Sequence, residues 1–194
     1  MKNTNYLLTI IVPTYNEVDN VANFINKIKE ILKNINFQIL FVDDNSTDGT
    51  IDKVNKFKQI YDNVELIVRI GRRGLSGACI EGIQNAKSNY VAIIDCDLQH
   101  DEKLLLKMLQ TFEKEELLDL VIGSRHVEEG DSQKGLSYLR NLGSRYAIKL
   151  TQKLLKIKIN DPMSGFFMAK KISIHSLLPK LQPNGFKILA DILA

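Results

Sequence analysis

The chain of 194 residues lacks tryptophan, and it contains only two cysteines, four prolines and 7% aromatic residues. Cys79 and Cys96 stand in apolar surroundings with no metal-ligand or redox spacing, so we expect buried thiols in a reducing, cytosolic compartment. Long hydrophobic runs are missing too, and the strongest run, residues 7–12, is interrupted by Thr9. It is shorter than the roughly 20 apolar residues that cross a bilayer. We therefore expect neither a membrane-spanning helix nor a secretory signal, and the run predicts a strand.

The overall composition is typical of one folded domain. Hydrophobic residues make up 44% of the chain and charged residues 25%, which excludes the disordered and fibrous classes. The net charge of +3 is uneven, because residues 134–158 contain no acid and leave 19 basic against 23 acidic residues elsewhere. The basic residues of this basic segment are Lys134, Arg140, Arg145, Lys149, Lys153, Lys156 and Lys158. A predicted helix over residues 135–157 has a basic edge, which is typical either of a solvated face or of contact with anionic lipid headgroups.

Apolar runs alternate with segments of helical period along the first 125 residues. We predict strands over residues 7–12, 38–42, 64–68, 90–94 and 118–122. We predict helices over residues 18–32, 50–60, 75–86 and 102–112, with a turn and cap at residues 46–49. This order predicts an α/β fold with a mostly parallel central sheet and helices on both faces, in a single domain over residues 1–194.

Acidic and polar residues follow three of the predicted strands. They are Pro13, Tyr15, Asn16 and Glu17 after the first strand, Asp43, Asp44 and Ser46 after the second, and Asp95 and Asp97 after the fourth. Ligands of open α/β sheets bind beyond the carboxyl ends of the strands, and hard divalent cations take carboxylate ligands. Each acid pair also fits a local role, since Asp95 and Asp97 could cap a helix and the other pair could form a turn before Gly49.

The chain contains, in order, the motifs PTYNE, FVDDNSTDGT, GRRGLSGA, IIDCDLQH, GSRH, LRNLGSR, DPMSGFF and NGFKI. These motifs resemble those of the inverting family-two glycosyltransferases, and most closely the dolichol-phosphate or polyprenol-phosphate mannosyltransferase branch. The resemblance covers residues 10–189, and it implies the GT-A fold, which agrees with the strand pattern. The form of the GRRGL segment implies GDP-mannose as the donor. Cys96 stands in the middle of the DxD motif, where alanine is commoner in the family.

The resemblance implies roles for the residues at matching positions. The nucleotide sugar would contact Pro13, Tyr15, Asn16, Glu17, Asp43, Asp44, Ser46, Asp95 and Lys187. A Mg²⁺ or Mn²⁺ ion would be held by Asp95, Asp97 and Gln99. Asp97, Arg125 and Arg140 would act in catalysis, although both arginines also fit structural ion pairs. No ligand role is assigned to His100, His126 or His175, and residues 164–167 fit either an acceptor cleft or apolar core.

Together these implications predict transfer of mannose from GDP-mannose to a dolichyl or polyprenyl phosphate, with inversion and with a divalent cation. We expect no nucleic-acid partner, and peripheral contact with the cytoplasmic face of a membrane or with a membrane subunit. A UDP-sugar donor and a non-catalytic nucleotide-sugar-binding subunit are the alternatives. A DxD phosphatase or phosphomutase is a weaker rival, because such enzymes use the first aspartate as nucleophile near the start of the domain. The chain ends within a helix predicted from Gly185, so we expect a truncated family member without the usual acceptor elements.

Overall fold

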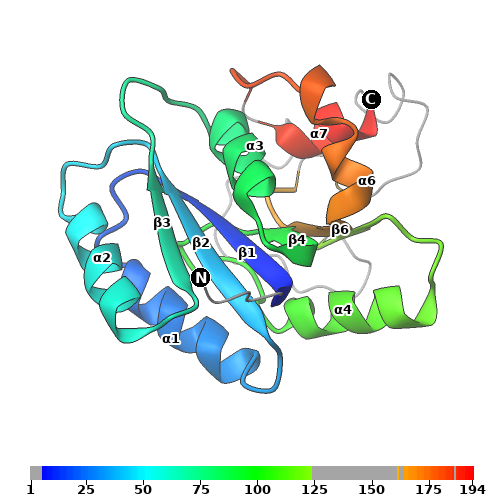
Figure 1. The fold of residues 1–194 in the computed structure, drawn as a ribbon, viewed down its shortest axis with the longest axis horizontal. Helices are drawn as coiled ribbons and strands as arrows, with labels where there is room; N and C mark the ends of the chain where they lie inside the picture. The colour runs from blue at the N-terminus through cyan, green and yellow to red at the C-terminus, as the bar shows by residue number, and fades with distance from the viewer. Residues whose placement is uncertain (1–5, 124–160, 162–163, 186) are drawn as a thin grey trace, which may run out of the picture.

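The computed structural model describes residues 6–123, 161, 164–185 and 187–194 (Figure 1). The strands are β1 (Tyr6–Thr14), β2 (Phe37–Asp43), β3 (Val64–Val68), β4 (Ser88–Ile93), β5 (Leu120–Ile122) and β6 (Phe167–Lys170). The helices are α1 (Val21–Ile31), α2 (Thr50–Ile60), α3 (Leu75–Asn85), α4 (Leu104–Lys114), α6 (Lys171–His175) and α7 (Ile188–Leu193). A short 3₁₀ turn, Leu178–Lys180, lies between the last two. Among the described residues, no helix is both long and apolar enough to cross a bilayer.

The six strands form one sheet in the order β3-β2-β1-β4-β6-β5. β1 pairs in parallel with β2 on one side and with β4 on the other, whereas β6 runs antiparallel to both of its neighbours. The chain therefore adds strands first on one side of β1 and then on the other. In open α/β sheets such a reversal opens a crevice beyond the carboxyl ends of the two diverging strands, where ligands bind. In this sheet the reversal falls between β1 and β4.

Two apolar layers enclose the sheet. On one face α1, α2 and α4 pack against alternate residues of β1 and β2, and on the other face α3, α6 and α7 pack against the intervening residues. Every residue of β2 is buried because this strand has neighbours on both edges and helices on both faces. α3 approaches the sheet closely at Gly82, where an added Cβ would lie 2.4 Å from Cγ2 of Ile11. These layers hold the strand ends in fixed relative positions.

The sequence predictions for the first five strands are confirmed, with bounds that differ by a few residues. The helix at residues 50–60 begins and ends as predicted, and α4 begins at Leu104, two residues after the predicted start. β6 was not predicted, because three apolar residues followed by a lysine, without alternation, give little strand signal. The predicted helix over residues 135–157 and the basic segment lie outside the described residues.

Candidate functional site

The carboxyl ends of β1, β2 and β3 stop at the same level of the sheet. Thr14 is paired with Asp43, and Asp43 is paired in turn with Val68. The next pairs continue this register, since the Asp44 amide donates to the Thr14 carbonyl at 2.9 Å and the Arg69 amide donates to the Asp43 carbonyl at 2.8 Å. The loops that follow these strands are therefore brought to one rim, as the sequence predicted for the first two of them.

Asp43 is fully buried and accepts three hydrogen bonds within this rim. The Ser46 amide donates to Oδ1 at 2.7 Å, while Oγ1 of Thr14 and Oγ of Ser46 donate to Oδ2 at 2.7 and 2.8 Å. A carboxylate offers about four lone-pair sites, so most of this group is already satisfied by the protein. Asp43 thus forms the turn that the sequence allowed as an alternative, and its direct contact with a nucleotide stays a prediction.

Four further hydrogen bonds join the loop after β1 to the loop after β2. The Asn16 amide donates to Oγ of Ser46 at 2.8 Å, and the Thr47 amide donates to Oδ1 of Asn16 at 3.0 Å. The amides of Glu17 and Val18 donate to Oγ1 of Thr50 and Oδ2 of Asp48, at 2.8 and 3.1 Å. Burial of Asp48 opposes ionisation, but hydrogen bonds from Thr50 and Val18 outweigh it and lower the Asp48 pKa. The two loops consequently form one rigid unit.

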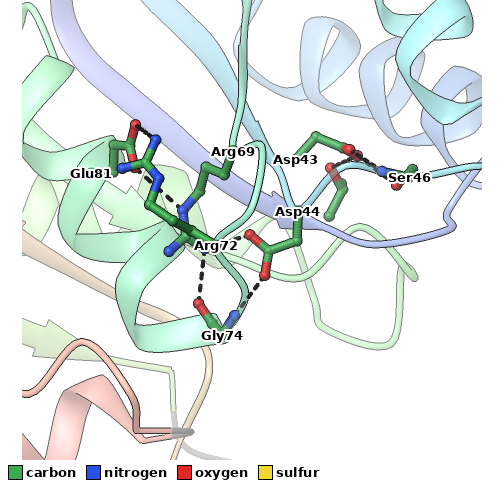
Figure 2. Close-up of polar contacts among 8 residues, drawn as sticks. Asp43, Asp44, Ser46, Arg69, Arg72, Gly74 and Glu81 are labelled. Carbon is green, nitrogen blue, oxygen red and sulfur yellow. Dashed lines mark hydrogen bonds and ion pairs between the residues drawn. The ribbon is translucent and has the colours of Figure 1, made fainter.

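Asp44 pairs with Arg69, which the sequence analysis did not select (Figure 2). Arg69 follows β3, is 4% exposed, and donates through Nη1 to Oδ1 of Asp44 and, at 3.1 Å, to the Gly74 carbonyl. The Gly74 amide completes the group by donating to the other Asp44 oxygen at 2.7 Å. Gly74 has a φ of +125°, which a side chain would strain. The signal for Arg69 was a charged residue directly after a predicted strand, at the edge where the other strand ends carry acids that could pair with it.

Glu81 on α3 extends this cluster to the GRRGL segment. Its carboxylate lies 3.3 Å from Nε of Arg69 and 3.0 Å from Nη1 of Arg72 (Figure 2). The next arginine, Arg73, lies over the ring of Tyr15, with Cζ 4.6 Å from the ring centroid. Tyr15 is 45% exposed, so one face of an accessible aromatic ring is held by a cation at the rim. This segment therefore links the loops that follow β1, β2 and β3.

The loop after β4 carries the DxD motif and has a different character. The side chain of Asp95 is 42% exposed, Asp97 is partly exposed, and Gln99 is exposed. Oδ1 of Asp97 accepts the Gln99 amide at 3.1 Å, which forms a tight turn around Leu98. Leu98 has a φ of +59°, a left-handed conformation that is unfavourable for a bulky side chain. Asn16 and Asn45 also have positive φ, so all three such non-glycine residues in the described part of the chain lie in strand-end loops of this rim.

His100 and Gly165 lie beside Asp95. Nε2 of His100 is 3.5 Å from Oδ2 of Asp95, and the His100 ring packs on Phe166 with centroids 5.3 Å apart. A Cβ added to Gly165 would lie 3.0 Å from the same Asp95 oxygen. The sequence analysis did not predict that either residue lies next to Asp95, although His100 follows the DxD motif by three residues.

The two buried thiols indicate that the acids of different strands lie near one another. Burial, together with the negative charges of Glu17, Asp97 and Asp95, raises the pKa of the Cys96 thiol to about 12. Burial also raises the pKa of Cys79, and the negative charges of Asp95 and Asp44 contribute to this rise. Through these two thiols, acids that follow β1, β2 and β4 share one electrostatic environment.

Lys187 is exposed at the start of α7. The segment before it packs on the GRRGL region, since the Ser76 amide donates to the Gly185 carbonyl at 3.1 Å and the Pro183 carbonyl lies 3.5 Å from a Cβ built on Gly74. This brings the last predicted nucleotide-binding segment to the rim. Arg125 and Arg140 lie outside the described residues, so their predicted contacts with phosphate stay predictions.

The chemistry of the DxD loop fits a divalent cation that is shared with a phosphate ligand. Within the described ranges, no three or more histidine, cysteine or acidic side chains are arranged to bind a metal by themselves. Mg²⁺ commonly binds through one or two carboxylates, with water and substrate phosphates supplying the other oxygens. Asp95 and Asp97, both accessible to solvent, supply such a pair, and the amide oxygen of Gln99 is a further hard donor.

Comparison with known proteins agrees with this architecture. The chain belongs to glycosyl transferase family 2, whose model matches residues 9–178. Its relatives include the dolichol-phosphate mannosyltransferases of Pyrococcus furiosus, 36% identical over 188 residues, and of Saccharomyces cerevisiae, 31% identical over 192 residues. Each alignment covers 96% of this chain, but 52% of the archaeal protein and 69% of the yeast protein. The chain therefore spans about half the length of the first relative.

Solved structures confirm the fold. The mannosyltransferase PcManGT from Pyrobaculum calidifontis, in complex with GDP-Man and Mn²⁺, superposes with a TM-score of 0.67 at 17% identity, over 96% of this chain and 50% of that one. Glucosyl-3-phosphoglycerate synthase from Mycobacterium tuberculosis, in complex with UDP, gives 0.70 at 16% identity, over 97% and 64%. At these identities the likeness concerns the fold alone, which is the GT-A arrangement that the sequence predicted.

Proposed function

We propose that this chain transfers mannose from GDP-mannose to a polyprenyl or dolichyl phosphate, with inversion and with the help of a divalent cation. The observation that carries the proposal is the loop after β4, at the point where the strand order reverses, in which the carboxylates of Asp95 and Asp97 stay partly exposed. The names of the relatives favour the mannosyl and lipid-phosphate parts, because the alignments cover nearly the whole chain. The neighbour in complex with GDP-Man and Mn²⁺ favours the donor and the cation.

The rim divides the proposed work between two groups of residues. Tyr15, Glu17 and Lys187 are accessible polar or aromatic groups that would contact the base and ribose. Asp43, Asp44 and Ser46 would support this pocket, because their side chains already hold its loops together. A pocket that is fixed before the ligand arrives loses less entropy on binding.

On the other side, Asp95, Asp97 and Gln99 would hold Mg²⁺ or Mn²⁺. When bound, the cation would neutralise charge on the departing diphosphate. Asp97 presents Oδ2 for this purpose, since Oδ1 accepts the Gln99 amide within the turn. The positive φ of Leu98 is the conformational cost of this turn, and such costs are typical of sites where orientation matters.

The transfer needs no dedicated general base in this proposal. A phosphate monoester has a second pKa of about 6, so at neutral pH its oxygen is already a nucleophile. The protein has to position this oxygen in line with the leaving diphosphate, and a single displacement inverts the anomeric carbon. Arg125 and Arg140 are the proposed anchors for phosphate oxygens, and the basic segment around Arg140 would bring the protein to the cytoplasmic face of a membrane.

A donor panel tests the proposal. The full chain is incubated with Mn²⁺, a short polyprenyl phosphate and one of GDP-mannose, UDP-glucose or UDP-GlcNAc, and lipid products are separated and counted. We expect mannosyl lipid only, and none from Asp97→Ala. Asp101→Asn is the matched control, because Asp101 is an exposed acid of the same loop whose capping role asparagine retains. Product from a UDP-sugar would overturn the donor assignment, and GDP binding without any lipid product would favour the non-catalytic subunit.

A further inference from the structure

His100 is a largely but not fully buried polar residue to which the proposed reaction assigns no task. Its side chain is 10% exposed, and its ring packs on Phe166 at an interplanar angle of 47°. Nε2 lies 3.5 Å from Oδ2 of Asp95, the first aspartate of the DxD motif. The ring thus packs on Phe166, and its Nε2 lies close to one oxygen of a candidate metal ligand.

Gly165 lies against the same oxygen. A Cβ built on Gly165 would be 3.0 Å from Oδ2 of Asp95 but 3.9 Å from Oδ1, so the backbone closes around one side of the carboxylate. The position of this backbone is fixed by Ser164, whose Oγ donates to the Gly123 carbonyl at 2.8 Å and accepts the Phe166 amide at 3.1 Å. Two segments far apart in the sequence therefore confine Oδ2 of Asp95.

We propose that His100 and Gly165 act as positioning residues for Asp95, holding Oδ2 so that Oδ1 is the oxygen offered to the cation and the donor diphosphate. The χ2 angle of aspartate has broad wells, so an unsupported carboxylate turns easily away from a ligand. Groups that contact a metal ligand from behind fix its orientation, and their loss typically weakens metal affinity about 10- to 100-fold. This inference rests on the proposed function, because it assigns Asp95 to the cation that accompanies the nucleotide.

The two positions restrict Asp95 by different means, which gives two independent variants. His100→Phe keeps an aromatic ring against Phe166 but removes the nitrogen that faces Asp95. His100→Gln loses the ring but keeps an amide donor at a similar reach. Gly165→Ala adds a methyl group 3.0 Å from Oδ2 and forces the carboxylate to move. A role of His100 in packing alone predicts that the Phe variant behaves as the wild type and that the Gln variant does not.

The test measures GDP binding to the full chain by calorimetry, with Mn²⁺ and with EDTA, and takes the ratio of the two dissociation constants as the metal effect. We expect His100→Phe and Gly165→Ala to reduce the metal effect about 10-fold, with metal-free GDP affinity and the midpoint of urea unfolding unchanged. We expect His100→Gln to keep the metal effect within about threefold. His175→Phe is the matched control, because His175 is exposed on α6, away from the rim, and it should behave as the wild type.

The outcomes separate this inference from the proposed function. If the wild type binds GDP more tightly with Mn²⁺ but His100→Phe keeps the full metal effect, the positioning role is wrong and the proposed function stands. The same holds if His100→Phe and His100→Gln lose the metal effect equally, since an amide donor at this position would then fail to replace the imidazole nitrogen. If the wild type shows no GDP binding or no metal effect, the proposed function itself fails, and the inference fails with it.

Discussion

The two halves of the rim differ in how far the protein satisfies its own polar groups. After β1, β2 and β3, the acids Asp43 and Asp44 are buried and accept hydrogen bonds from Thr14, Ser46, Arg69 and Gly74. After β4, Asp95 and Asp97 stay accessible, and Asp97 accepts one amide from within its own turn. The sequence shows two acid pairs that look alike, whereas in the structure only the first pair is buried and hydrogen-bonded by the protein. In the proposed function the second pair is the one that binds a ligand from outside.

The largest expected effect comes from Asp97→Asn. This change removes a negative charge from the accessible half, so we expect mannosyl transfer to fall at least about 100-fold, a size typical of lost transition-state charge stabilisation. The free energy of unfolding should change by less than about 0.5 kcal/mol, because the side chain is partly exposed and an amide can still accept within the turn. Activity assays and urea denaturation measure the two quantities. A large loss of stability would mean that Asp97 supports the fold as Asp43 and Asp44 do, and the difference between the two acid pairs would then be wrong.

Arg69→Met is expected to have the largest effect on stability. It leaves the buried carboxylate of Asp44 without its cation, and removal of one partner of a buried ion pair costs about 3–5 kcal/mol. Urea denaturation should detect a loss toward the lower end, since the Gly74 amide still donates to Asp44. In the double variant with Asp44→Asn, much of the loss should be recovered, because no buried charge is left unpaired. Equal stability of the wild type and Arg69→Met would mean that Asp44 does not depend on this ion pair, and that the two halves of the rim do not differ in this respect.

Ser46→Ala tests the hydrogen bonds between the loops after β1 and β2, and we expect a smaller loss of stability than for Arg69→Met. The hydroxyl donates to Asp43 and accepts the Asn16 amide, so its loss leaves two groups without this partner. We expect the free energy of unfolding to fall by about 1–3 kcal/mol, and GDP affinity to fall because the loop after β1 is no longer held. Ser176→Ala, at an exposed position beside the start of β4, should change neither quantity.

The smallest expected effect is a change with pH in the stability that the Cys96 thiol contributes. Since burial raises the folded-state pKa of Cys96 from its ordinary 9.0 to about 12, the neutral thiol favours the folded state below pH 9, and this contribution disappears as the pH rises toward 12. The stability difference between the wild type and Cys96→Ala should therefore shrink by roughly 1 kcal/mol between pH 8 and pH 10. A difference that stays constant would mean that the thiol ionises freely in the folded protein.

Patterns within one segment predicted most of the fold. The apolar run that became β2, the repeat of Val21, Phe24, Ile25 and Ile28 on α1, and the turn before α2 all depend on neighbours within a few residues. β6 escaped prediction because its place in the sheet depends on pairing with β4, more than 70 residues away in the chain.

The candidate site follows the same division. The positions of the acids after the strands could be predicted, because parallel strands bring their carboxyl ends together. Their division into a buried pair and an accessible pair could not, since the burial of Asp44 depends on its ion pair with Arg69, 25 residues further along the chain. His100 shows this most clearly, as nothing in its own segment indicates the contact with Phe166.

The most direct test of the account is calorimetric titration of GDP into the full chain, with Mn²⁺ and with EDTA, for the wild type and Asp97→Asn. The account predicts that the wild type binds GDP in both conditions and more tightly with Mn²⁺, and that Asp97→Asn keeps the metal-free affinity but loses the gain. Absence of GDP binding, or a gain from Mn²⁺ that survives in Asp97→Asn, would contradict it.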